Sequence, residues 1–251
     1  MMKVLVVGDA CEDVYVYGTC SRLAPEAPVP VFVKKHSKST GGMALNVYNN
    51  IKSLGVDCEI IHNKAEIQKT RYVDDSSNHL FIRIDSDESL VDRIEKKYLR
   101  KKFLLEYDAI VISDYDKGFL TKEDIEKICY YHPLTFMDTK KKLGRWSEDC
   151  KWIKINSVEY ENTKQLISDR MYIYDERLVV TMGSDGCRYK DKTYPVNKVE
   201  IKDLSGAGDT FLAGFATKYL KTNDVDQALK FANKCATIVV QQKGVNIVSA
   251  I

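Results

Sequence analysis

The sequence lacks the features that mark several large classes of protein. Its net charge at pH 7 is only +2, which is too small to indicate a nucleic-acid partner. No apolar run approaches the roughly 18 residues that a membrane-spanning helix needs. The N-terminus passes into Val4–Val7 without the layout of a signal peptide. We therefore expect a cytoplasmic protein that has no nucleic-acid partner and no membrane partner.

Disulfide frameworks and zinc sites are also not indicated. The seven cysteines are odd in number, widely scattered and free of any C-x-x-C pair, and the four histidines show no ligand spacing. Hydrophobic residues make up 44% of the 251-residue chain, which is enough for a normal core. The length predicts one large α/β domain over 1–251.

Short apolar runs that end in polar or glycine-bearing tips recur along the chain. Lys3–Val7 predicts a buried first strand, because a β-branched apolar run of this length is typical of a parallel sheet. Four similar runs predict further strands at Ala109–Ser113, Leu134–Met137, Trp152–Ile155 and Arg177–Thr181. The pattern predicts a doubly wound, mostly parallel sheet with helices on both faces and one ligand-binding edge.

Glycine, proline and capping residues set the bounds of the other predicted elements. Gly41–Gly42 opens a helix that runs to about Leu54 and stops at Gly55. Thr121 caps a helix through about Tyr130. The remaining expected elements are an extended proline-rich segment over 21–30, a strand over Val31–Lys35, hairpins at 71–84 and 187–195, a charged helix over Leu90–Leu105 and a helix over about Val225–Val240.

Two groups of residues in the N-terminal part could bind a hydroxylated ligand. Asp9 and Asp13 follow the first strand, where open α/β sheets place ligands, although Asp9 could equally cap the turn. Gly41 and Gly42 would let backbone approach a ligand closely, and Asn46 offers a donor and an acceptor. A tight connection would explain the two glycines but not the polar side chain of Asn46.

The stretch Asp203–Phe211 carries the strongest chemical signal. Gly206 and Gly208 precede an apolar helical run, so backbone N–H groups can converge on an anion where the helix begins. Asp209 would stand beside the bound anion, an odd place for a carboxylate unless it handles a proton. A carboxylate at a helix N-terminus should have a low pKa, so we expect a weak base.

The two glycine segments together resemble the signatures of the PfkB (ribokinase-like) carbohydrate kinases. The first is Gly41–Asn46, with Gly55 closing the helix, and the second is Asp203–Asp209. Within that family the chain most resembles the heptose-7-phosphate kinase domain of the bifunctional heptose kinase/adenylyltransferase. The segments that carry this closer resemblance include Val6–Asp9, Ser21–Val31 and Ile112–Gly118.

The resemblance implies a kinase that transfers the γ-phosphoryl group of ATP to a hydroxyl of a sugar or sugar phosphate. D-glycero-β-D-manno-heptose 7-phosphate is the specific acceptor that it suggests. The cofactors that the resemblance implies for this chain are ATP and Mg²⁺, with a monovalent cation as a further candidate. Asp209 would be the general base, and the backbone amides of Gly206, Ala207 and Gly208 would form the anion hole.

The resemblance also assigns binding residues. The N-x-x-E motif would act near the ATP phosphates and Mg²⁺, with Glu159 as an indirect metal contact. The full set implied for the nucleotide is Asn156, Ser157, Val158, Glu159, Thr181, Gly183, Gly186 and Asn233, the last near the adenine. The set implied for the sugar is Asp13, Gly41, Gly42 and Asn46, to which the strand-end position adds Asp9.

One departure from the family concerns the β lid, whose strands we expect from about 12–36 and 70–86. A segment of the resembling kinases is missing between about Ile61 and Thr70, so we expect a small, shortened lid. In the family the lid covers the sugar and often forms a homodimer. An alternative is therefore a catalytically silent binding relative with a truncated lid.

A Rossmann dehydrogenase fits the sequence poorly, since its glycine loop should follow the first strand. We expect no adenylyltransferase half.

Overall fold

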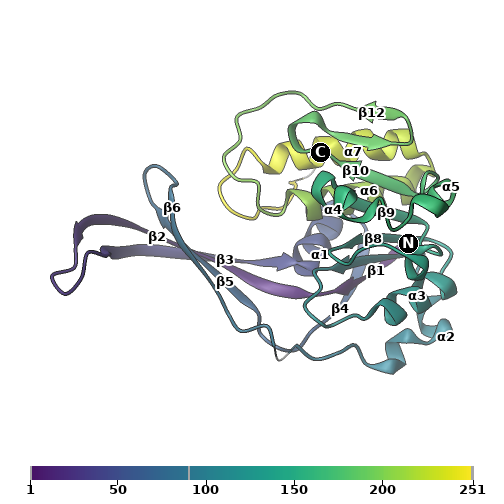
Figure 1. Cartoon of the computed structure of the whole chain (residues 1–251), viewed down its shortest axis with the longest axis horizontal. Helices are drawn as coiled ribbons and strands as arrows, with labels where there is room; N and C mark the ends of the chain where they lie inside the picture. The colour runs from purple at the N-terminus through teal and green to yellow at the C-terminus, as the bar shows by residue number, and fades with distance from the viewer. Residues whose placement is uncertain (1, 90, 250–251) are drawn as a thin grey trace.

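The chain forms a large β-sheet inside a helical body and a second, smaller sheet that projects from it (Figure 1). The computed structural model describes residues 2–89 and 91–249. The large sheet has eight strands in the order β12-β11-β10-β9-β8-β7-β1-β4, and the projecting sheet has four in the order β3-β2-β5-β6.

Six neighbouring strands of the large sheet are parallel, which confirms the predicted fold class. The two strands at one edge form an antiparallel hairpin, also as predicted. The strands are β1 (Lys3–Gly8), β4 (Asp57–His62), β7 (Ala109–Asp114), β8 (Thr135–Thr139), β9 (Trp152–Asn156), β10 (Leu178–Thr181), β11 (Cys187–Tyr189) and β12 (Lys192–Tyr194).

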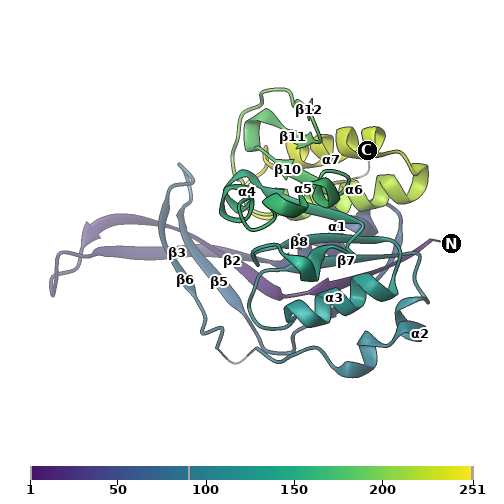
Figure 2. The same cartoon turned by 45° about the vertical axis from the view of Figure 1, so that its right-hand side comes forward.

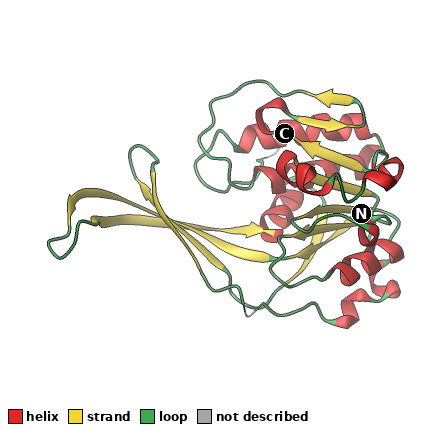
Figure 3. Cartoon of the chain, viewed as in Figure 1, coloured by secondary structure: helices red, strands yellow, loops and turns green. Residues whose placement is uncertain are grey.

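Helices cover both faces of this sheet (Figures 2 and 3). Alternate residues of a strand point to opposite faces, so Val4 and Val6 pack toward one helical layer while Leu5 and Val7 pack toward the other. The first layer is α1 (Ala44–Ser53), α6 (Ala207–Thr222) and α7 (Val225–Val239), and the second includes α3 (Lys122–Tyr131). Shorter helices are α2 (Lys101–Leu104), α4 (Ser157–Thr163) and α5 (Met171–Tyr174), with single 3₁₀ turns at Lys96–Leu99, Arg145–Ser147, Ser168–Arg170 and Gly183–Asp185.

Over residues 2–89 and 91–249, none of these helices has the length and apolar character to cross a membrane.

The projecting sheet, which we call the lid, consists of β2 (Ala10–Leu23), β3 (Pro30–Met43), β5 (Gln68–Asp74) and β6 (Leu80–Asp85). These bounds overlap the lid strands expected from the sequence. The proline-rich segment is less loop-like than predicted, because β2 continues to Leu23 and β3 begins at Pro30, where a strand tolerates a missing N–H. The connection between β4 and β5, over 63–67, is short, and it lies where we expected a family segment to be missing.

Two predicted helix bounds are wrong. Gly41–Met43 is the end of β3, paired with β2, and α1 begins only at Ala44. The expected helix over 90–105 is mostly absent: Leu90 lies outside the described residues, and 91–95 is irregular. The Asp92 carboxylate accepts the N–H groups of Lys64 and Ala65, and Ile94 N–H bonds Phe119 O. These long-range bonds replace the helical ones.

Candidate active site

A cleft of about 680 Å³ lies along the carboxyl ends of β8, β9 and β10, bounded by the start of α6 and by α7. This volume falls within the range of small-molecule sites. Its position agrees with the ligand-binding edge expected from the sequence. The sequence-predicted residues that line it are Asn156, Thr181, Gly183, Gly186, Gly206, Ala207, Gly208 and Asn233. The amide of Asn233 is engaged, since it donates to Tyr194 O at 2.7 Å.

The rest of the N-x-x-E motif does not line the cleft. Asn156 and Glu159 form a capping box for α4: Asn156 Oδ1 accepts the Glu159 N–H at 2.9 Å, and Glu159 Oε2 accepts the Asn156 N–H at 2.8 Å. The other Glu159 oxygen binds Lys140 Nζ. The Ser157 hydroxyl donates to Thr181 O, and Val158 is exposed. Glu159 therefore contacts two cleft residues, Asn156 and Lys140, but does not line the cleft itself.

At the start of α6, two glycines allow other groups to lie close to the backbone. Gly206 is the N-cap with φ 77°, and a Cβ there would lie 2.5 Å from Asn46 Nδ2. A Cβ on Gly208 would lie 2.9 Å from Lys154 Nζ. The Ala207 N–H is bonded to Leu204 O at 3.3 Å. The N–H groups of Gly206, Gly208 and Asp209 are the remaining donors at this helix end.

The Asp209 carboxylate is buried, with 3% of the residue exposed. Its Oδ1 accepts the Tyr115 hydroxyl at 2.7 Å and its Oδ2 accepts Asn46 Nδ2 at 3.2 Å. Asn46 belongs to the first glycine segment and Asp209 to the second, so the two predicted signatures meet here. The expected low pKa is wrong: burial raises the pKa of Asp209 to about 6, outweighing the hydrogen bonds that lower it.

A buried ion pair lines the cleft, and the sequence analysis did not predict it. Lys154 Nζ lies 2.6 Å from Asp138 Oδ2, and both residues are at least 95% buried. The other oxygen, Asp138 Oδ1, is buried without a hydrogen-bond partner. A signal was present, because Lys154 interrupts an otherwise apolar strand in which a charge needs a partner.

On the lid side of Asp209, polar groups gather on one face of β2 and β5. Asp13 Oδ1 lies 2.5 Å from Arg71 Nη1, and a Cβ on Gly42 would lie 2.0 Å from Asp13 Oδ2. Lys69 stands opposite Asp13 in the ladder and places its ammonium 5.6 Å from the Tyr115 ring centre. Gly41 lies apart from this group and lines a smaller cavity of about 480 Å³.

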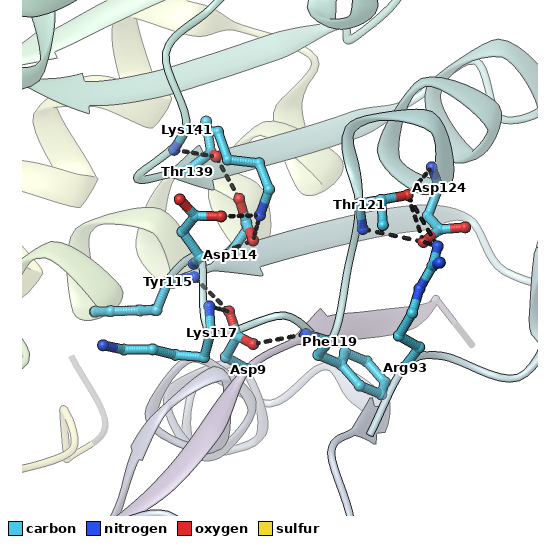
Figure 4. A network of polar contacts seen from close by, with 11 residues as sticks. Asp9, Arg93, Asp114, Tyr115, Lys117, Phe119, Thr121, Asp124, Thr139 and Lys141 are labelled. Atoms are coloured by element: carbon cyan, nitrogen blue, oxygen red, sulfur yellow. Dashed lines mark hydrogen bonds and ion pairs between the residues drawn. The ribbon is translucent and has the colours of Figure 1, made fainter. Parts of the chain in front are cut away.

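Asp9 is turned away from both groups. Its carboxylate accepts the backbone N–H groups of Tyr115, Lys117 and Phe119, at 2.7, 3.4 and 3.4 Å (Figure 4). The residue is fully buried. Of the two readings that the sequence left open, the geometry matches the structural one, in which Asp9 holds a turn.

Comparison with known proteins places the chain in a family. The family described as "pfkB family carbohydrate kinase" matches residues 109–250. The chain belongs to the pfkB family of carbohydrate kinases. This membership confirms the resemblance and the enzyme class predicted from the sequence.

Curated relatives of this pfkB family member include the bifunctional protein HldE of Helicobacter pylori strain J99, which is 32% identical over 296 residues. The match covers 97% of this chain and 64% of that protein. HldE of Nitratiruptor sp. is 29% identical over 290 residues, covering 96% of this chain and 62% of that one. The chain thus spans somewhat less than two thirds of the length of these relatives.

Solved structures show the same fold at low identity. Ribokinase from Thermotoga maritima superposes with a TM-score of 0.72 at 13% identity, covering 98% of this chain and 95% of that one. The nucleoside kinase of Methanocaldococcus jannaschii gives 0.68 at 19% identity, covering 98% and 93%. Both are described as ribokinases or ribokinase family members.

The cleft residues fit a nucleoside triphosphate. Lys140 and Lys154 supply positive charge, the start of α6 supplies N–H donors, and Val199, Ile201 and Val240 supply an apolar wall for a base. Among residues 2–89 and 91–249, no group of three or more His, Cys, Asp or Glu side chains could hold a metal ion.

The buried pair generates a stability prediction. Lys154→Met should lower the free energy of unfolding by about 3–5 kcal/mol at pH 7, because Asp138 would stay buried without its partner. The double variant Lys154→Met/Asp138→Leu should regain most of this loss, since neither charge is then buried. Urea unfolding followed by circular dichroism measures both, and equal losses in the single and double variants would contradict the pairing.

Proposed function

We propose that this chain is an ATP-dependent sugar kinase in which Asp209 is the general base. The observation that carries the proposal is the position of the Asp209 carboxylate, buried where a helix begins. Gly206–Gly208, directly before it in the chain, line a nucleotide-sized cleft. The Tyr115 ring, whose hydroxyl binds the carboxylate, lies 5.6 Å from the ammonium of Lys69, which stands opposite Asp13 on the lid. Phosphoryl transfer needs mainly positioning, charge stabilisation and one residue to receive the hydroxyl proton.

In the proposed reaction the acceptor hydroxyl oxygen attacks the γ-phosphorus. The new O–P bond forms, the bond to the ADP oxygen breaks, and Asp209 receives the hydroxyl proton. Lys154 and the Gly208 N–H would face the charge on the transferred group. With a pKa of about 6, Asp209 stays largely ionised at pH 7 and is a better base than an exposed aspartate.

The alternative of a silent binding protein gives no reason for this arrangement. Burying an ionised carboxylate is costly, and here the cost is met by donors from two distant segments, Asn46 and Tyr115. A protein that only bound sugar or nucleotide would have no need of a base at this point. The lid also retains four strands despite the short 63–67 connection.

A phosphorylated sugar is the acceptor class that the lid-side charges favour. Lys69 is 8% exposed, and within the described part of the chain no carboxylate lies within ion-pair distance of its ammonium. A buried ammonium without a carboxylate calls for an anionic partner. A phosphate on the substrate would supply it, in keeping with the D-glycero-β-D-manno-heptose 7-phosphate suggested by the sequence.

Sugar-dependent ADP release from ATP, measured over a panel of sugars and sugar phosphates, tests the kinase proposal. We expect at least one acceptor to stimulate turnover, and Asp209→Asn to lower kcat by about 10²–10⁴-fold. Binding of ADP, measured by calorimetry, should be retained in that variant. Full activity of Asp209→Asn would remove Asp209 as the base, and no stimulation by any sugar would refute the kinase.

The acceptor class is tested by Lys69→Met, which keeps the length of the side chain but removes its charge. We expect KM for a phosphorylated acceptor to rise by about 10–100-fold, the size of a hydrogen bond to a charged group. KM for the unphosphorylated sugar should be unchanged. Lys64→Met, at an exposed lysine paired with Glu95, is the matched control. An equal effect on both acceptors would argue against phosphate recognition by Lys69.

We also propose a homodimer through the lid strands. The edge strand β6 exposes a row of apolar side chains, Leu80, Ile82 and Ile84, each about half exposed. Such an edge offers open backbone groups and an apolar strip to another strand. A second copy of the same strand would match it, because a two-fold interface joins identical surfaces.

Sedimentation velocity tests the dimer. The wild-type chain should sediment as a dimer, and Ile82→Glu as a monomer, because a charge on the strip would have to be buried in the interface. Ile247→Glu, at a similarly exposed position outside the lid, should leave the dimer intact. A wild-type monomer at all concentrations would refute the proposal.

A further inference from the structure

Tyr115, the residue directly after β7, touches both Asp209 and Asp9. Its hydroxyl donates to Asp209 Oδ1 and its backbone N–H donates to Asp9 Oδ2, each at 2.7 Å. Its side chain also lines the cleft. Neither the glycine segments nor the N-x-x-E motif contains this residue.

The loop that carries Tyr115 is held at several points (Figure 4). Asp9 accepts the N–H groups of three alternate residues, Tyr115, Lys117 and Phe119. Lys141 binds both Asp114 and Asp116, at 2.6 and 2.8 Å, and Thr139 donates to Asp114. These bonds fix the backbone on both sides of Tyr115, so its hydroxyl has a defined place.

We propose that Tyr115 is a positioning residue for the kinase reaction, whose hydroxyl holds the Asp209 carboxylate ionised and oriented while Asp9 anchors its backbone. This inference rests on the proposed role of Asp209 as base. Asn46 holds the second carboxylate oxygen. Each oxygen can accept two hydrogen bonds, so the acceptor hydroxyl can bind Asp209 without displacing either donor.

The groups around Asp209 have opposite effects on its pKa. Burial raises the pKa of Asp209, and the charge of Asp138 adds to this effect, whereas the bonds from Tyr115 and Asn46 and the charge of Lys154 lower it. The titratable and charged groups around it are Tyr115 after β7, Asp138 on β8, Lys140 after β8, Lys154 on β9 and Cys11 on β2. Burial and the charge of Asp209 hold the pKa of Tyr115 well above its usual value, so the hydroxyl stays a donor at neutral pH.

The aromatic ring has a separate set of contacts. The ammonium groups of Lys140 and Lys69 lie 5.3 and 5.6 Å from its centre, within reach of a cation–π interaction. Lys140 belongs to the nucleotide cleft and Lys69 to the lid. Tyr115→Phe keeps the ring and both contacts, so it isolates the hydroxyl.

The test is the pH dependence of kcat/KM in Tyr115→Phe. The wild-type rate should fall below about pH 6 as Asp209 becomes protonated. In the variant the pH at which the rate falls should be higher by about one to two units, the size expected when a carboxylate loses a hydrogen bond. The two rates should converge at high pH, where Asp209 is ionised in both proteins. Loss by the same factor at every pH, or no change, would overturn the proposal.

Two further variants sharpen the comparison. Asp9→Asn removes the carboxylate that holds the Tyr115 backbone, so the fall should move in the same direction by a smaller amount. An unmoved profile would remove Asp9 from the proposal. Tyr130→Phe is the matched control, because Tyr130 is 73% exposed, and its profile should equal that of the wild type.

A substrate-free measurement separates this inference from the proposed function. Carboxyl ¹³C NMR of aspartate-labelled protein, with Asp209→Asn assigning the signal, gives the pKa of Asp209 directly. A higher pKa in Tyr115→Phe supports the inference even if no sugar stimulates ADP release, in which case only the proposed function fails. An unchanged pKa in an active enzyme would overturn the role of Tyr115 alone.

Discussion

The burial of one carboxylate constrains much of this structure. Asp209 stands at the start of α6, 163 residues after Asn46 and 94 after Tyr115, and both residues donate to it. A buried carboxylate is stable only with such donors. The start of α1, the loop after β7 and the glycine turn before α6 must therefore meet at one point. Gly206 has no room for a side chain, because Asn46 occupies that space.

Charges on the two sides of Asp209 are compensated differently. In the cleft, Lys154 is paired with Asp138 inside the protein and Lys140 with Glu159. On the lid, Arg71 is paired with Asp13, whereas Lys69 forms no ion pair among residues 2–89 and 91–249 and places its ammonium 5.6 Å from the centre of the Tyr115 ring. Paired charges can be held without ligand, and the remaining positive charge is available to an anion. This difference is the physical basis for assigning recognition of the acceptor's own phosphate, as distinct from the phosphates of ATP, to Lys69.

Prediction from the sequence succeeded where local signals and tertiary contacts agree. Thr121 caps α3 as expected, and the apolar runs become the parallel strands. It failed where distant groups replaced local bonds, as at 91–95, where Asp92 and Ile94 bond to segments far along the chain. Asn156 and Glu159 show a middle case, since the predicted motif is present but its groups cap α4.

The sequence by itself determined the fold class and the glycine segments, because apolar periodicity, capping and backbone freedom are local properties. It also singled out Asp209 and Asn46 by residue type. Only the tertiary structure decided that their side chains touch, that Asp9 anchors a loop, and that Tyr115, Lys69 and Lys154 belong to the same region. The tertiary structure also raises the pKa of Asp209, where the sequence predicted a low one, because burial depends on residues brought together from the whole chain. Local patterns encode elements, whereas the electrostatics of a site depend on what surrounds it.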